Sequence, residues 1–284
     1  MVEHSIIAAR TFALLAMTVA VGCIGNEDVA GFDELESSFD SAALGQVDPA
    51  DVSVVIANSL APSALVPTDL GIHSLSNMSA ATASSLRSAN GASLRDLLEY
   101  AVGCALDVGD NFEFFWFDAN GVKRQESYNG ALGLARAWRN RALNVPEQHA
   151  VSACLAARTN WYEEPLSISQ RGGLSRLSAT ADEINRYRYR EGAFWGNLFG
   201  PTPYLQACYE ESNVEYARAR HRDCAAGHVE SDSVVDCGMI AIVGSCQETC
   251  IGLTAGGYYF GCSARQEGLP PDVSMHLAVT VFLE

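Results

Sequence analysis

Basic residues are scarce in this chain, and lysine is almost absent. The 284 residues hold 18 Lys and Arg against 34 Asp and Glu, a net charge of −16, and Lys123 is the only lysine. A protein that binds nucleic acid through its charge needs a basic face, so this composition excludes that class. Charged residues make up 18% of the chain and hydrophobic residues 48%, which indicates a globular protein rather than a wholly disordered one.

Long apolar runs and familiar catalytic motifs are also missing. No apolar run reaches the roughly 18 residues that a transmembrane helix needs. The sequence has no G-x-S-x-G elbow, P-loop, GxGxxG, H-E-x-x-H or EF-hand loop. We therefore expect no cofactor and no metal. Four histidines of the body have no recognisable triad partner, and we interpret them as surface or core residues: His149, His221, His228 and His276.

Residues 1–22 have the layout of an export signal. Arg10 and the α-amino group precede an apolar core that ends at Val21, too short to span a bilayer as a helix. The core leads into Ala20-Val21-Gly22-Cys23. This segment resembles the lipobox of bacterial lipoproteins, although Ala20 stands where that family prefers Leu. The resemblance implies cleavage after Gly22, a diacylglyceryl group on Cys23 and acylation of the new amine. The alternative is an ordinary cleaved signal in which Cys23 is incidental.

Lipidation would give this protein a firm membrane anchor. One acyl chain alone binds a bilayer only marginally, whereas three chains hold a protein there essentially permanently. In the lipoprotein family, Asp after the lipidated Cys marks retention in the inner membrane, and here that position is Ile24. The resemblance therefore implies export to the outer membrane or cell surface.

Residues 23–90 read as a tether. The stretch from Ile24 to Leu86 holds nine acids and no Lys or Arg, which is typical of a solvated, extended segment. Between residues 59 and 71, Leu and Pro each recur every five residues, a period that fits neither a helix nor a strand. We interpret this part as a turn-rich linker. The alternative is that Leu60, Leu65 and Leu70 pack along the folded body.

Residues 91–284 are expected to form one α+β domain, with two or three helices packed on a small mixed or antiparallel sheet. Apolar spacing predicts helices at 93–106, where Ser93-x-x-Asp96 suggests a capping box, and at 146–161, with a short helix at 180–186. A hairpin is predicted over 111–128, with at least one strand buried on both faces, and extended segments at 166–169 and 191–199. Every second residue near the end of the chain is apolar, which predicts a terminal strand: Val273, Met275, Leu277, Val279, Val281 and Leu283.

The body holds an even number of cysteines once Cys23 is set aside. Because export leads to an oxidising compartment, we expect them to form four disulfides. We predict Cys104–Cys154, since each lies alone in a predicted helix, and three bridges within a cysteine-rich subregion at 205–265. The alternative is zinc, for which Cys224 with His228 and Cys246 with Cys250 have ligand-like spacing. The eight cysteines are Cys104, Cys154, Cys208, Cys224, Cys237, Cys246, Cys250 and Cys262.

A glycine-rich aromatic segment is the most suggestive place for a ligand pocket. Glu191 could act there as a general acid if a second carboxylate, such as Asp182, Glu163 or Glu164, lay nearby. The interpretation we favour is an aromatic core strand in which glycines allow close backbone approach. The candidate pocket residues are Trp161, Tyr162, Glu191, Phe194, Trp195 and Asn197.

Four runs of the body resemble a group of uncharacterised exported proteins of myxobacteria. They are LGLA at 132–135 with Trp138, VSACLAARTN at 151–160, SISQRG at 167–172 and EGAFWGNLF at 191–199. The likeness covers roughly Ser93 to Cys208. That group has no established activity, so the resemblance supplies no catalytic residue and implies only an exported, cysteine-rich product.

These features favour a lipid-anchored envelope protein with a binding or surface-presentation domain. Its expected partners are the membrane, through the lipid anchor, and an unidentified protein or glycan, with no nucleic acid. The alternative is an envelope hydrolase that acts on polysaccharide or peptidoglycan through Glu191. A third hypothesis is a scaffold that binds no small ligand.

Overall fold

The computed structural model describes residues 55–263 and 277–284. The predicted signal, Cys23, the first part of the tether, Val273, Met275 and His276 lie outside the described residues. Within that part the protein is α+β, as the sequence predicts.

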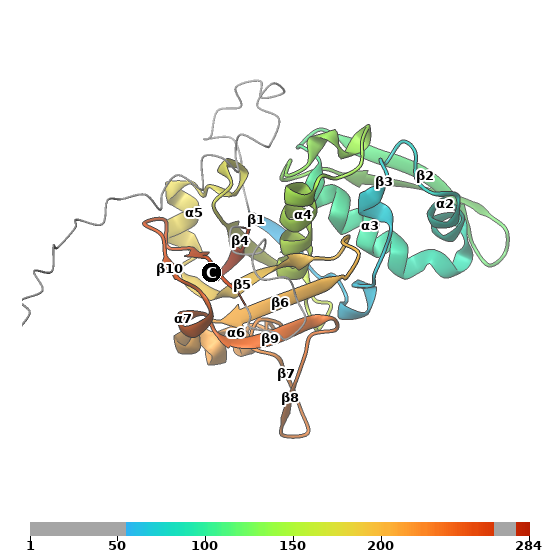
Figure 1. The fold of residues 1–284 in the computed structure, drawn as a ribbon. Coiled ribbons are helices and arrows are strands. Elements are labelled where there is room, and N and C mark those ends of the chain that lie inside the picture. The colour runs from blue at the N-terminus through green and yellow to red at the C-terminus, as the bar shows by residue number, and fades with distance from the viewer. Residues whose placement is uncertain (1–54, 264–276) are drawn as a thin grey trace, which may run out of the picture.

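A six-stranded mixed sheet forms the centre of the protein (Figure 1). All neighbouring strands are antiparallel except β6 and β9, which run parallel. In spatial order the strands are β1 (Val55–Asn58), β4 (Leu166–Arg171), β12 (Val279–Leu283), β5 (Tyr189–Asn197), β6 (Tyr204–Tyr209) and β9 (Ile240–Ser245). The C-terminal strand is therefore not at an edge but between β4 and β5.

The predicted terminal strand is confirmed over β12, but its second face is also buried. Thr280 accepts a hydrogen bond from the Tyr259 backbone N–H at 2.8 Å. The ring of Phe282 lies 3.8 Å from the guanidinium carbon of Arg171. A central strand that is covered on both faces buries its polar side chains as well as its apolar ones. Thr280 can be buried because its hydroxyl has a hydrogen-bond partner.

Two long helices correspond to the two predicted ones. The helix α4 (Val145–Arg158) packs across β5 and also contacts β6 and β12, and α3 (Ala92–Ala105) packs on α4. A capping box begins α4: Asn144 and Glu147 each accept the other's backbone N–H at 2.9 Å. The capping box predicted at Ser93 is wrong, because α3 continues directly from a 3-10 turn and its N-cap is Gly91.

The described residues contain more helices than the two or three expected. The short helix predicted at 180–186 is confirmed as α5 (Ala181–Arg186). The additional ones are also short and lie in connections: α2 (Ala80–Arg87), α6 (Val214–Ala219) and α7 (Cys246–Thr249). Three two-stranded sheets also lie outside the main one: β2 (Asn111–Phe117) with β3 (Lys123–Asn129), β7 (His228–Glu230) with β8 (Ser233–Val235), and β10 (Gly252–Leu253) with β11 (Tyr259–Phe260). Four of these strands have only two or three residues, so no alternation of apolar and polar residues can predict them from the sequence.

The predicted hairpin at 111–128 is confirmed as β2–β3, but its predicted burial is wrong. Asp118 closes the turn by accepting the backbone N–H groups of Asn120 and Val122 at 3.0 and 2.9 Å. The pair forms its own sheet beside α2 and α3, away from the main sheet (Figure 1). Phe112 and Phe114 pack against the core, while Phe117, on the other face, remains 43% exposed.

Residues 55–90 belong to the folded body, so the predicted tether boundary at residue 90 is too late. The alternative holds: Leu60, Leu65 and Leu70 are all buried in the main core. Pro62 begins a 3-10 turn instead of an extended linker, and a second turn follows at Leu70–Ile72. Gly71 lies so close to Phe199 that an added Cβ would sit 2.5 Å from the ring.

All eight body cysteines are paired. The predicted bridge Cys104–Cys154 is confirmed and joins α3 to α4. The remaining six pair among themselves, as expected, in three local bridges: Cys208–Cys246, Cys224–Cys237 and Cys250–Cys262.

We expect Leu65→Ala to destabilise the body by about 2–5 kcal/mol, the usual cost of a cavity at a buried leucine. Val66→Ala is the matched control, since Val66 is 40% exposed, and it should cost less than about 0.5 kcal/mol. Urea unfolding of both variants measures the difference. Equal stability of the two variants would contradict the assignment of this segment to the folded body.

Candidate functional site

Glu191 forms a buried ion pair instead of lining an open pocket. Its Oε2 accepts from Arg222 Nε at 3.0 Å and from Arg222 Nη2 at 2.7 Å. Both side chains are essentially inaccessible to solvent. Burial raises the pKa of the Glu191 carboxyl, and the adjacent guanidinium opposes that rise. A carboxylate held in this way is not positioned to protonate a substrate.

Arg222 also completes the end of α4. Its Nη2 donates to the Ala157 carbonyl at 3.1 Å, and its Nη1 donates to the Thr159 carbonyl. The last carbonyls of a helix have no partner within the helix and carry partial negative charge, so a cation there is favoured. One arginine thus connects α4 to β5.

The other predicted pocket residues of β5 are also packed. Phe194 and Trp195 are completely buried, and Trp195 Nε1 donates to Gln206 Oε1 at 2.8 Å. Asn197 donates to Gln148 Oε1 at 3.0 Å, which ties β5 to α4. The aromatic segment is therefore a core strand. The predicted pocket is wrong for these residues because α4 packs on this strand beside Phe194 and Asn197, while a second apolar cluster around the C-terminal disulfides encloses Trp195.

Trp161 and Tyr162, in contrast, reach a polar cluster that the sequence did not predict. Six side chains form this group, which we call the histidine cluster. Trp161 stacks on His228 with centroids 4.2 Å apart, and Tyr162 stacks on His221 at 4.8 Å. They come from the segment after α4, the loop after α6 and the start of β7. The members are Trp161, Tyr162, Glu164, His221, Asp223 and His228.

Each histidine of the cluster is held by a carboxylate. His228 Nδ1 lies 2.7 Å from Asp223 Oδ2, and His221 Nδ1 lies 2.8 Å from Glu164 Oε2. The two pairs differ in burial: Asp223 is 3% exposed, whereas His221 and Glu164 both lie at the surface. The strong and specific pair is therefore Asp223 with His228.

Asp223 is the hub of this site. Its Oδ2 also accepts a hydrogen bond from the Tyr162 hydroxyl at 3.2 Å. Burial raises the pKa of the Tyr162 hydroxyl, and the neighbouring Asp223 charge adds to that rise. The other oxygen, Oδ1, is buried and has no partner among the described residues. A buried acceptor without a hydrogen-bond partner lowers the stability of the fold. Its presence here is therefore consistent with a functional role for Asp223.

The backbone is strained beside the cluster. Glu163 and His221 both adopt a left-handed conformation with φ of 55°, although neither is glycine. Such residues cost about 1–3 kcal/mol each and concentrate at functional sites. Their coincidence in two loops that meet here supports a role for this surface beyond packing.

The arrangement can supply an oriented imidazole. A carboxylate at Nδ1 requires a proton there, which leaves Nε2 of His228 free to accept a proton or a hydrogen bond. The His228 side chain is 18% exposed, so solvent or a ligand can reach it. This is the geometry that positions a general base, or a specific hydrogen-bond acceptor in a binding surface.

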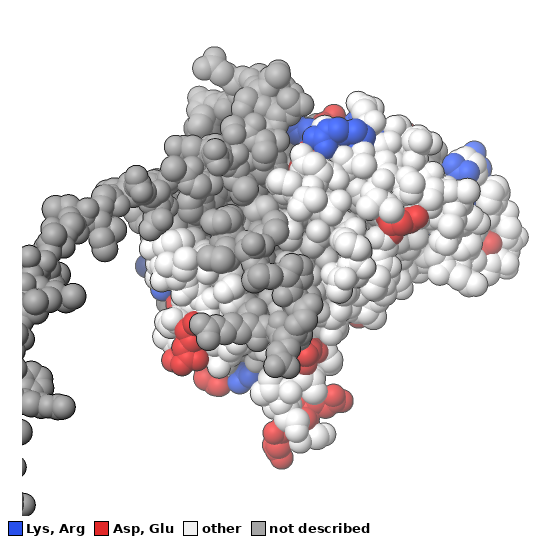
Figure 2. All heavy atoms as spheres, viewed as in Figure 1, with Lys and Arg blue, Asp and Glu red and all other residues white. Residues whose placement is uncertain are grey.

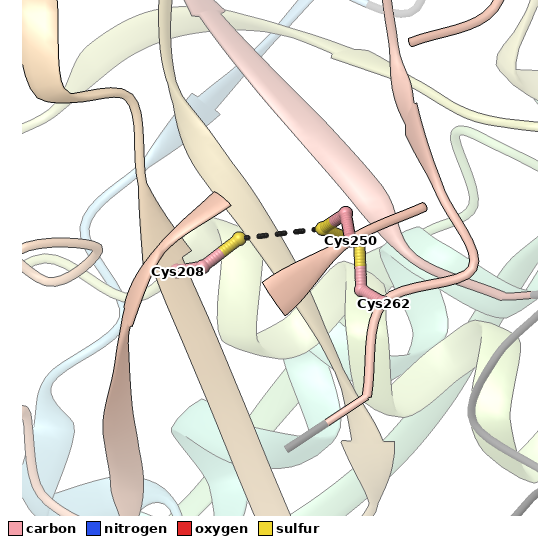
Figure 3. A group of neighbouring side chains, drawn as sticks. All are labelled: Cys208, Cys250 and Cys262. Carbon is pink, nitrogen blue, oxygen red and sulfur yellow. Dashed lines mark hydrogen bonds between the residues drawn. A yellow bond between two sulfur atoms is a disulfide. The ribbon is translucent and has the colours of Figure 1, made fainter. Parts of the chain in front are cut away.

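The zinc alternative is wrong for the cysteines that suggested it. Cys224 pairs with Cys237 in a disulfide, and Cys246 and Cys250 belong to two different disulfides. The sulfurs of Cys208, Cys250 and Cys262 lie within 4.8 Å of one another, and Figure 3 shows the three side chains as neighbours. All three are oxidised, so they offer no thiolate to a metal in this state.

Two further surface features lie outside the histidine cluster. An open groove of about 480 Å³ lies between the segment at 66–69 and helices α2 and α3, and none of its lining residues belongs to the histidine cluster. Figure 2 shows acidic side chains gathered at the end of the molecule that carries the β7–β8 hairpin, where Glu230 and Asp232 are exposed.

Comparison with known protein families, with curated proteins and with solved structures finds no match for this chain. Among the residues that the structure describes, no helix combines the length and apolarity needed to cross a bilayer.

We expect Asp223→Ala to release His228 from its single tautomer, because the hydrogen bond at Nδ1 decides which nitrogen carries the proton. Long-range ¹H–¹⁵N spectra of histidine-labelled protein should show a protonated Nδ1 in the native chain and a mixture in the variant. Glu164→Ala, which removes the exposed partner of His221, should leave the His228 signals unchanged. Native-like His228 signals in Asp223→Ala would contradict the assignment of Asp223 as the orienting group.

Proposed function

We propose that this chain is an exported, lipid-anchored protein of the cell envelope whose folded body serves in binding or surface presentation. The observation that carries the proposal is the complete pairing of the eight body cysteines. Stable disulfides are typical of proteins in an oxidising compartment. The pairing leaves Cys23, in the lipobox-like segment, as the one cysteine of the chain without a partner in the body.

The anchor places the body outside the inner membrane. The lipobox-like end of the signal and Ile24 after Cys23 favour the outer membrane or cell surface. The resemblance to exported myxobacterial proteins is consistent with the same destination. Because residues 55–90 are part of the fold, the spacer between the anchor and the body is residues 24–54 at most.

The histidine cluster is the surface that we propose for the partner, a protein or a glycan. It combines Tyr162, Glu164 and His221 at the surface with the oriented imidazole of His228 behind them. Aromatic rings and carboxylates together can contact the apolar and hydroxyl faces of a sugar or the side chains of a protein. No cofactor is part of this proposal.

An envelope hydrolase remains the second candidate, with a different residue at its centre. Glu191 no longer supports it, but the pair of Asp223 and His228 is an oriented imidazole of the kind that activates water. Isolated peptidoglycan distinguishes the two functions. Release of soluble fragments that His228→Ala abolishes would favour the hydrolase, and retention of the protein without release would favour binding.

Cys23→Ser tests the anchor directly. In a bacterium that produces the full chain, an alkyne-tagged fatty acid should label the native protein, and the variant should lose the label and leave the detergent phase. Ala20→Leu is the matched control, since it brings the segment closer to the lipobox and should keep or raise labelling. Equal labelling of Cys23→Ser and the native chain would overturn the proposed anchor.

A further inference from the structure

Two of the four disulfides lie in direct contact. Cys208 Sγ, on β6, is 3.7 Å from Cys250 Sγ, at the residue that follows α7 (Figure 3). The first belongs to the bridge Cys208–Cys246 and the second to Cys250–Cys262. The sulfur of Cys262 is also within 4.8 Å of both. The described structure shows no such group around Cys104–Cys154 or Cys224–Cys237.

The environment of this pair decides which sulfur an outside reagent meets first. The four cysteines form a small apolar cluster of their own with Ala193, Trp195, Tyr259 and Ala278. Cys250 is 9% exposed, whereas the other three cysteines are completely buried. Its neighbour Ile251 is 66% exposed. Cys250 is therefore the most exposed cysteine of this group and lies next to an exposed residue.

We propose that these two bridges form a thiol–disulfide exchange site that reacts with an external dithiol. A thiolate of the dithiol attacks Cys250 Sγ, the bond to Cys262 breaks, and Cys262 leaves as a thiolate that takes up a proton. The second thiol of the dithiol then attacks the mixed disulfide, which releases the oxidised reagent and leaves Cys250 as a thiolate.

In the second step, the free thiol is transferred from Cys250 to the buried bridge Cys208–Cys246. The Cys250 thiolate attacks Cys208 Sγ, the bond between Cys208 and Cys246 breaks, and Cys246 leaves as a thiolate that is protonated. Two electrons pass from the dithiol to the protein, which ends with the bridge Cys208–Cys250 and thiols at Cys246 and Cys262. The contact at 3.7 Å means that this exchange needs little movement of the attacking sulfur.

The exchange changes which segments of the chain the disulfides join. The bridge to β6 moves from Cys246, the first residue of α7, to Cys250, which follows the helix. The loop from Ile251 to Cys262, which carries β10 and β11, loses its covalent closure. Only non-covalent contacts then hold the loop, including the bond from the Tyr259 hydroxyl to Glu210 Oε2 at 2.7 Å. The proposal depends on the geometry of the sulfurs and goes beyond the proposed envelope function.

Cys262→Ser in the full chain tests the second step, because it leaves a Cys250 thiol beside the intact Cys208–Cys246 bridge. After incubation at mildly alkaline pH, acid quenching and alkylation, cleavage at Glu248 separates Cys246 from Cys250 for mapping. We expect on the order of a tenth or more of the molecules to carry Cys208–Cys250 with alkylated Cys246. Alkylation confined to Cys250, with Cys208–Cys246 retained throughout, would overturn the proposal.

The matched control is Cys237→Ser, which frees Cys224 outside the sulfur group. Its other three bridges should stay unchanged under the same conditions. The native chain provides a test that does not depend on the folding of a variant: after brief treatment with dithiothreitol, the first two-thiol species should contain Cys208–Cys250. A first two-thiol species with Cys208–Cys246 intact and no trace of the new pairing would contradict the exchange.

Discussion

The buried ion pair between Arg222 and Glu191 is the interaction on which the rest of the arrangement depends. Arg222 holds the last carbonyls of α4 and a carboxylate of β5 at the same time. Burying both charges is expensive, and the cost is offset only because the guanidinium has partners on several sides. The loop after α6 is thereby fixed against the centre of the fold. Asp223 and Cys224 follow Arg222 directly in that loop.

Everything in the histidine cluster follows from this placement. Asp223 is buried because its neighbour Arg222 is drawn into the core, and its carboxylate meets Tyr162 beyond the end of α4. The bridge Cys224–Cys237 closes the other side of the segment that carries His228. Core electrostatics and a disulfide thus hold an imidazole at the surface, where it can accept a proton or bind a partner. The contacting sulfurs of Cys208 and Cys250 lie in a separate apolar cluster, so their chemistry is independent of this site.

Sequence patterns predicted the parts of this protein that depend on local periodicity. The two long helices, the β2–β3 hairpin and the bridge Cys104–Cys154 could be read from apolar spacing and from cysteines in isolated positions. The sequence of 55–90 resembles a linker because its buried leucines lie in a β-bridge at Leu60 and in or beside 3-10 turns at Leu70 and Leu65, which gives no regular apolar period. Sequence patterns do not reveal the histidine cluster, because Glu164 is 57 residues from His221 in sequence. The sequence also does not show that Arg222, next to Asp223, is buried. The sequence singles out Trp161, Tyr162, Glu164, His221 and His228 separately, and only the fold brings them together around Asp223.

A double-mutant cycle on the central ion pair tests this account most directly. Arg222→Met, Glu191→Leu and the double variant would be compared with the native chain by urea unfolding with the disulfides intact. We predict that each single change costs about 3–5 kcal/mol, because it leaves one buried charge unpaired, and that the double change costs far less than the sum. Additive losses, or single losses below about 1 kcal/mol, would show that this pair does not organise the fold.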